Sequence, residues 1–181
     1  MEHTCFIGKR ICSNRKTIIT MSIVQASQFV GKYALTKAFN DGQLKIVQMI
    51  VDVEFTYLNE LFGVDLCEVF LDEYTTEPRF IKLMTPFAFE HCGNVKTCRG
   101  IEQMLLGFVY THYLNEMQGV STSVGKMTPG PEAGKLDNGL NVISFYNESV
   151  NDFNMIVDYL RLNREVYPGM KGNHKLLSYH F

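Results

Sequence analysis

The first strong pattern of apolar and polar residues lies between Gln43 and Phe62. Polar residues recur there at steps of three and four, namely Lys45, Gln48, Asp52, Thr56 and Asn59. Apolar residues fill the opposite side, and this spacing is typical of a long amphipathic α-helix. Gly63 follows immediately and is expected to end the helix.

Four further segments have a readable pattern. Residues 65–74 predict a second helix, with Leu66, Val69, Phe70 and Tyr74 pointing inward, and residues 79–84 predict a helical turn. Irregular chain is expected from there to Gly100. Ile101 to Met117 is apolar nearly all round, which indicates a helix buried on several sides. Gly107 in its middle predicts that another helix passes close by, since glycine costs helix stability.

The last predicted helix runs from about Tyr146 to Val166. Its core stripe has apolar residues at steps of four and three: Tyr146, Val150, Phe153, Val157 and Leu160. Four more apolar residues lie beside that stripe: Met155, Ile156, Tyr159 and Leu162. A single small domain has difficulty covering so much apolar surface, so we expect these four to form a contact between subunits.

Weaker patterns occupy two other stretches. Residues 22–39 predict one or two short helices. The 24 residues 118–141 contain five glycines and two prolines, and they predict a long loop. Within it, 120–127 and 140–145 are candidates for the two strands of a β-hairpin. The expected fold is therefore mainly α, a small helical bundle with a long loop or β-hairpin between the last two helices and an extended arm at each end.

Charge divides the chain further. The 181 residues carry a net charge of −2, but residues 1–20 carry Lys9, Arg10, Arg15 and Lys16 against one acid. Residues 41–77 hold nine acids and one base, which makes that stretch repulsive to phosphate. We divide the chain into a basic arm (1–22), a helical domain (23–166, with the protruding loop 118–141) and a C-terminal tail (167–181). The tail is apolar at Leu176, Leu177, Tyr179 and Phe181 and is expected to become ordered on a partner.

Candidate chemistry is sparse. Five cysteines occur without a C-x-x-C spacing, and His91, Cys92 and Cys98 do not supply four metal ligands at a familiar spacing. His112 lies mid-helix, where histidine is usually a packing residue. The sequence thus predicts no cofactor, no metal site and no enzyme activity, and no segment is long and apolar enough to span a membrane.

Several elements taken in order resemble the head-to-tail connector proteins of tailed phages. They are a long helix ending in Leu61-Phe62-Gly63, a helix rich in Tyr and Leu after Gly100, a Ser-Thr-x-x-Gly loop at 121–125 and a closing helix at 146–166. The likeness covers residues 23–166 and is greatest to versions from phages of Bacteroidetes, such as crAss-like phages.

The resemblance implies a role as well as a fold. It implies a virion protein, assembled in the cytoplasm of a bacterial host, that forms a twelvefold ring of identical subunits at the head-tail junction. The ring would contact the portal protein and other connector or tail proteins and extend the channel through which DNA passes. The loop residues Ser121, Thr122, Ser123, Gly125, Lys126, Met127 and Pro129 would contact the portal or a neighbour. Five acids would line the channel: Asp52, Glu60, Asp65, Glu68 and Asp72.

A second hypothesis remains open at this point. The basic arm would also suit a small nucleic-acid-binding protein, which would bind duplex DNA through Lys9, Arg10, Arg15 and Lys16 with a steep dependence on salt.

Overall fold

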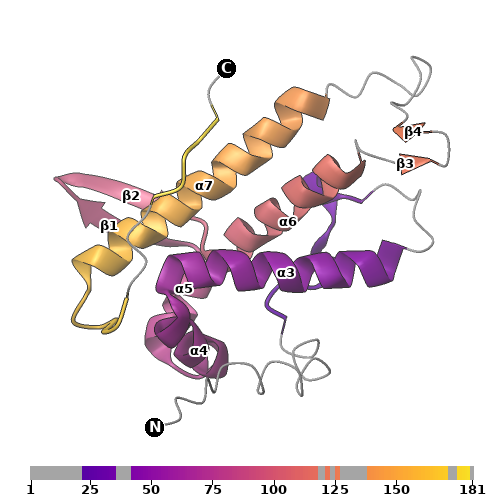
Figure 1. Cartoon of the computed structure of the whole chain (residues 1–181). Helices are drawn as coiled ribbons and strands as arrows, with labels where there is room; N and C mark the ends of the chain where they lie inside the picture. Colours follow the sequence, from indigo (N-terminus) through magenta and orange to yellow (C-terminus); the bar gives the residue numbers. More distant parts are fainter. Residues whose placement is uncertain are drawn as a thin grey trace, which may run out of the picture.

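The computed structural model describes residues 22–35, 42–117, 121–122, 125–126, 138–170 and 175–179 (Figure 1). This part of the chain is mainly helical, with five α-helices and a small antiparallel hairpin, so the mainly α prediction is confirmed. No helix in the described ranges has both the length and the hydrophobicity to cross a membrane.

Two consecutive helices carry the acidic part of the chain. Helix α3 spans Gly42–Phe62 and α4 spans Val64–Glu73, close to the predicted bounds. Gly63 joins them at a positive φ of 76°. The rings of Phe62, Phe70 and Phe80 pack on one another at this corner. Val69, which was predicted to point inward, is instead 38% exposed, because the contact with α3 uses the opposite side of α4.

The segment after α4 differs from the prediction. Helix α5 (Pro78–Met84) fits the predicted helical turn, but the chain then forms strands β1 (Phe87–His91) and β2 (Asn94–Cys98) where irregular structure was expected. The strands are antiparallel, with Phe87 opposite Cys98 and His91 opposite Asn94. Cys92 and Gly93 both have positive φ (52° and 75°), as a two-residue type I′ turn requires.

Helix α6 (Ile101–Met117) lies at the centre of the domain, as predicted. Its residues from Met104 to Thr111 are all buried, because α3 covers one side and α7 another. The Gly107 prediction is also confirmed. Position 107 faces the backbone of Phe145 and the side chain of Ser149 on α7, and a Cβ atom there would collide with the Ser149 hydroxyl.

Helix α7 spans Asn138–Leu162, so it begins eight residues before the predicted start. The predicted pairing of 120–127 with 140–145 is therefore wrong, because 140–145 are the first turns of this helix and Val142 is buried. The loop is correspondingly shorter than predicted. Within it Ser121–Thr122 (β3) pairs with Gly125–Lys126 (β4), while Ser123, Met127 and Pro129 lie outside the described residues.

The segment 22–35 contains two short 3-10 helices, η2 (Ala26–Gln28) and η3 (Gly31–Tyr33), in line with the one or two short helices predicted for 22–39. The segment is tied to α3 by Glu54, which is only 7% exposed. The Glu54 carboxylate accepts hydrogen bonds from the Ser22 hydroxyl (3.0 Å) and from the Val24 N–H (2.7 Å). Burial raises the pKa of Glu54, and these hydrogen bonds offset only part of the rise.

The elements stack in a simple order. Helix α4 lies against α3, α3 against α6, and α6 against α7, while the residues 175–179 run along α7 (Figure 1). The acidic helix α4 and the C-terminal segment therefore lie on opposite sides of the domain. This order decides which surfaces are available to partners.

Candidate interaction surfaces

The apolar surface predicted to join subunits is largely buried within this chain. Ile156 and Tyr159 are 0% and 8% exposed. The unpredicted hairpin explains the difference, because the Phe87 and Phe89 rings pack against Tyr159 with centroid distances of 4.9 and 5.4 Å. Met155 is half-buried, and only Leu162 is well exposed, at 55%. The predicted contact between subunits through these four residues is therefore wrong for Ile156 and Tyr159.

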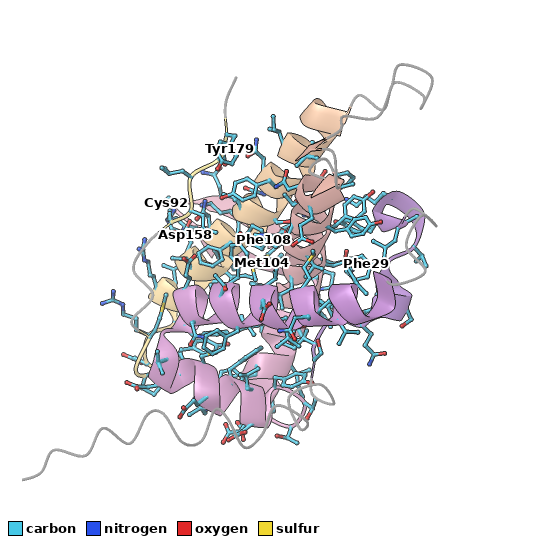
Figure 2. The ribbon with its side chains drawn as sticks, turned by 45° about the vertical axis from the view of Figure 1, so that its right-hand side comes forward. Phe29, Cys92, Met104, Phe108, Asp158 and Tyr179 are labelled. Carbon is cyan, nitrogen blue, oxygen red and sulfur yellow. The ribbon has the colours of Figure 1, made fainter. Side chains whose placement is uncertain are left out.

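The C-terminal tail was expected to become ordered on a partner, but residues 175–179 lie on α7 of the same chain (Figure 2). The Asn154 side chain donates to the Leu176 carbonyl oxygen (3.0 Å) and accepts from the Leu176 N–H (2.9 Å). The Asn147 side chain does the same with Tyr179, at 2.7 and 2.9 Å. We call Asn147 and Asn154 the Asn clamp. Phe181 lies outside the described residues.

The spacing of the Asn clamp suits an extended segment. Asn147 and Asn154 are seven residues apart on a helix, a distance of about 10.5 Å along the axis. Leu176 and Tyr179 are three residues apart, which spans about 9–10 Å in an extended chain. A primary amide offers a donor and an acceptor side by side, as a peptide group does, so each Asn pairs with both backbone groups of one residue.

Asp158 adds a charged contact at the start of the same segment. Its carboxylate lies 2.8 Å from the Lys175 ammonium and 3.2 Å from the Lys96 ammonium, so it joins the tail, α7 and strand β2. Burial alone would raise the pKa of Asp158, but the two ammonium groups outweigh it and hold the pKa below its ordinary value. The carboxylate is thus charged at neutral pH and stabilises this contact.

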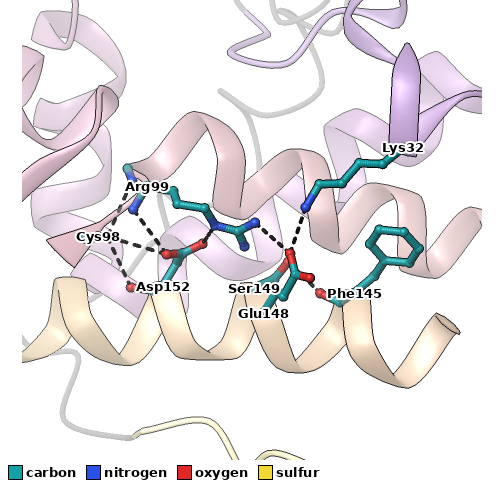
Figure 3. A network of polar contacts seen from close by, with 8 residues as sticks. Lys32, Cys98, Arg99, Phe145, Glu148, Ser149 and Asp152 are labelled. Atoms are coloured by element: carbon teal, nitrogen blue, oxygen red, sulfur yellow. Dashed lines mark hydrogen bonds and ion pairs between the residues drawn. The ribbon is translucent and has the colours of Figure 1, made fainter. Parts of the chain in front are cut away.

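A second polar network fixes α7 to the start of α6 (Figure 3). The Arg99 guanidinium contacts Asp152 and Glu148, each at 2.7 Å, and Glu148 also pairs with Lys32 at 2.8 Å. Asp152 also accepts a hydrogen bond from the Arg99 N–H at 3.2 Å. Asp152 and Glu148 are one helical turn apart, so one arginine can reach both. These contacts join three segments of one chain, which indicates a structural role.

The five acids predicted to line a channel lie on two helices. Asp65, Glu68 and Asp72 are exposed and share one face of α4, since they are separated by three and four residues. Asp52 is exposed on α3, beside a cleft described next. Glu60 is also exposed on α3. Burial raises the pKa values of Tyr57 and Tyr146, and the nearby charge of Glu60 raises them further. The acids therefore form a stripe on α4 and a separate pair on α3.

A cleft of about 400 Å³ opens between α3 and α6. Its lining includes Asp52 and Tyr57 from α3 and His112 and Glu116 from α6. The Tyr57 hydroxyl lies 3.4 Å from His112 Nε2, and burial lowers the pKa of His112. His112 is thus a neutral hydrogen-bonding residue at neutral pH.

Three of the five cysteines, Cys67, Cys92 and Cys98, lie in the part of the chain that the structure describes. Burial raises the pKa of Cys67 to about 11 and that of Cys98 to about 12, so both stay protonated at neutral pH. Cys92 is exposed at the tip of the hairpin. Among the residues that the structure describes, no three His, Cys, Asp or Glu side chains are grouped so that they could hold a metal ion.

Sequence reasoning missed the Asn clamp, although a signal was present. Asparagine is a poor helix former, so two asparagines seven residues apart on one face of a predicted helix indicate that their side chains have a specific role. The structure supplies one in the backbone of the tail.

Comparisons of the chain with models of protein families, with curated proteins and with solved structures gave no match.

Proposed function

We propose that this chain is a structural subunit of the ring that joins a phage head to its tail beneath the portal and extends the DNA channel. The observation that carries the proposal is the placement of two different surfaces on opposite sides of one helical domain. The acidic stripe lies on α4, and the α7 surface with its bound tail lies beyond α3 and α6 (Figure 1). A ring subunit needs such a division, because one side faces the channel and others face neighbours.

The acidic stripe suits the wall of a DNA conduit. Asp65, Glu68 and Asp72 are on one face of α4, and Glu73 and Glu77 follow in the sequence. A basic surface binds DNA because its cations replace the counterions of the phosphates. Carboxylates repel the phosphates instead, so DNA that passes such a wall is not bound by it. Repeated around a ring of about twelve subunits, a number taken from the resemblance to connector proteins, the stripe would give a channel through which DNA slides.

The order of the helices also supports the proposal. Helix α3 ends at Leu61-Phe62 before Gly63, α6 begins directly after Gly100, and α7 closes the domain. These are the elements on which the resemblance to connector proteins rests. In this proposal the partners are other copies of the chain, the portal protein, further connector or tail proteins and DNA bound without sequence specificity. The chain has a structural and not an enzymatic role.

The mass of the full chain in solution tests the proposal, measured by light scattering after size exclusion, alone and with the portal protein of the same phage. We expect a ring-sized species in at least the mixed sample, and images of it should show a central channel. A monomer in both samples would overturn the proposal. Tight, salt-sensitive binding of that monomer to duplex DNA, lost when Lys9, Arg10, Arg15 and Lys16 are replaced by alanine, would establish the nucleic-acid-binding alternative.

A charge-reversal variant tests the role of the acidic stripe separately. Glu68→Lys with Asp72→Lys changes two exposed side chains of α4, so assembly should be preserved while DNA is retained in the channel and its ejection slows. Glu90→Lys with Glu165→Lys is the matched control, since both are exposed and lie outside the stripe. Equal ejection rates for the two double variants would contradict the proposal that the acids of α4 line the channel.

A further inference from the structure

The hydrogen bonds of the Asn clamp do not depend on the identity of the tail side chains. All four hydrogen bonds made by Asn147 and Asn154 go to backbone N–H and C=O groups of Leu176 and Tyr179. Three side-chain contacts accompany them. Lys175 forms an ion pair with Asp158, Tyr146 packs on Tyr179 with ring centroids 5.0 Å apart, and the partly buried Leu176 side chain packs against the hydrophobic core. The clamp is therefore a site for an extended peptide segment with a free N–H at two positions three residues apart.

We infer that the Asn clamp also binds the C-terminal segment of a second copy of this chain, so that neighbouring copies are joined by exchanged tails. The inference rests on the contacts themselves and deepens the proposed function by naming how copies would join. No contact of residues 175–179 depends on the tail being covalently attached to the α7 that it touches. Every copy carries the same segment, with Lys175 placed to meet Asp158.

The way the tail lies on α7 allows exchange between copies as well as attachment within one chain. Leu177 is 85% exposed and Tyr179 is 56% exposed, so the partly buried Leu176 is the main apolar side chain that residues 175–179 place against the domain. With equal contacts in both arrangements, the effective concentration of the tail decides which one forms. A short linker gives a tail attached to the same chain an effective concentration on the order of millimolar, and a ring holds neighbouring copies at a comparable concentration.

The two halves of the contact can be separated in two full-length variants. Asn147→Ala with Asn154→Ala removes the clamp and leaves the tail intact. Leu176→Pro with Tyr179→Pro removes both tail N–H donors and leaves the clamp intact. All four positions are on the surface or half-buried, so both variants are expected to keep the far-UV circular dichroism spectrum of the unaltered chain.

Hydrogen exchange then tests binding between copies. The clampless variant is labelled with ¹⁵N, and exchange of its Leu176 and Tyr179 amides is followed by NMR, alone and with an excess of the unlabelled proline variant. We expect the two amides to exchange at least tenfold more slowly in the mixture, while the Leu177 amide, which has no hydrogen-bond partner in the described structure, stays unchanged.

Two controls and one outcome complete the test. A proline variant that also lacks the clamp should give no protection, and one that carries Asn151→Ala, an exposed α7 position outside the clamp, should protect fully. No slowing in the mixture, with the same amides protected in the unaltered chain, would overturn exchange between copies. The proposed ring is tested separately by the mass measurement. Rings that form without slowed exchange in the mixture would refute tail exchange alone. Slowed exchange without rings would support tail exchange and refute the ring.

Discussion

Because α6 approaches α7 closely at Gly107, we predict that Gly107→Ala destabilises the chain when residue 149 is serine and stabilises it when residue 149 is alanine. Gly107→Ala places a methyl group against the Ser149 hydroxyl, which donates to the Phe145 carbonyl oxygen at 3.0 Å. The hydroxyl must rotate away or the helices must separate. When Ser149 is alanine, the nearest remaining atom is the Cβ of residue 149, at an ordinary contact distance of 3.4 Å.

The size of each effect can be estimated. Replacing glycine by alanine in a helix is worth about 1 kcal/mol in favour of folding. Overpacking in a well-packed core costs about 1–3 kcal/mol, and a buried hydroxyl left without a partner adds about 1–3 kcal/mol. Gly107→Ala alone should therefore lower the free energy of unfolding by about 1–5 kcal/mol. In the Ser149→Ala background the same change should raise it by up to about 1 kcal/mol.

Urea unfolding of the unaltered chain, the two single variants and the double variant, followed by circular dichroism, gives the coupling free energy. We expect coupling of about 1–6 kcal/mol between the two positions, with the slope of each transition unchanged. If Gly107→Ala has the same effect in both backgrounds, to within about 0.5 kcal/mol, the helices do not approach each other as the structure describes, and the reason given for this glycine fails.

Three further predictions concern the core and the two pH-sensitive carboxylates. Phe153→Ala, at a fully buried position, should cost about 3–5 kcal/mol in urea unfolding, and an unchanged midpoint would contradict the α7 register. The lowered pKa of Asp158 means that its stabilising contribution is present above the unfolded value of 3.8 and is lost as pH falls through the folded value. The protection of the Leu176 and Tyr179 amides, measured as the observed exchange rate relative to the intrinsic rate at each pH, should therefore decrease in acid, and Asp158→Asn should abolish that decrease. The raised pKa of Glu54 has the opposite effect on stability: its contribution is complete below the unfolded value of 4.5 and is lost as pH rises through the folded value. The free energy of unfolding of the unaltered chain, relative to that of Glu54→Gln, should therefore increase on acidification from neutral pH to about 4.5. A difference that does not change with pH would argue against the burial of this carboxyl.

The long helices were predictable because one physical cause dominates them. Residues 43–62 have a 3.6-residue pattern and residues 101–117 are apolar nearly all round; both patterns are set by burial, and the structure begins and ends these helices within one residue of the prediction. The early start of α7 was missed for the opposite reason. Asn138, Gly139 and Asn141 are poor helix formers, whereas burial of Val142 in the folded domain favours the helix.

The hairpin was missed because of its turn. Asn-Gly and Asp-Gly are the familiar sequences for a type I′ turn, and here Cys92 takes the first position with a φ of 52°. The strands themselves alternate only weakly, since one face of the hairpin is open to solvent. Only Phe87 and Cys98 are fully buried in them, too few for a period of two to stand out.

The tail was misjudged because its contacts have no local signature in the sequence. Leu176 and Tyr179 are held by side-chain amides that are 22 and 32 residues away, through backbone groups that every residue except proline possesses. Periodicity records which side chains are apolar, and it carries no information about which backbone groups are bound. The tail therefore looked like an unsatisfied apolar segment in need of a partner.

Helix α7 now limits how an assembly of this chain could form. Ser149 packs on α6. Asp152 and Tyr159, seven residues apart on one face of α7, are covered by Arg99 and by the hairpin, and the face that carries the Asn clamp holds the tail. The surplus of apolar residues that suggested an exposed contact between subunits is therefore used within the domain. A neighbouring copy that binds at α7 can gain a large surface there only by replacing what already covers the helix. Of those covering elements, residues 175–179 leave Leu177 and Tyr179 85% and 56% exposed, so the tail is the element that we expect to be exchanged between two copies.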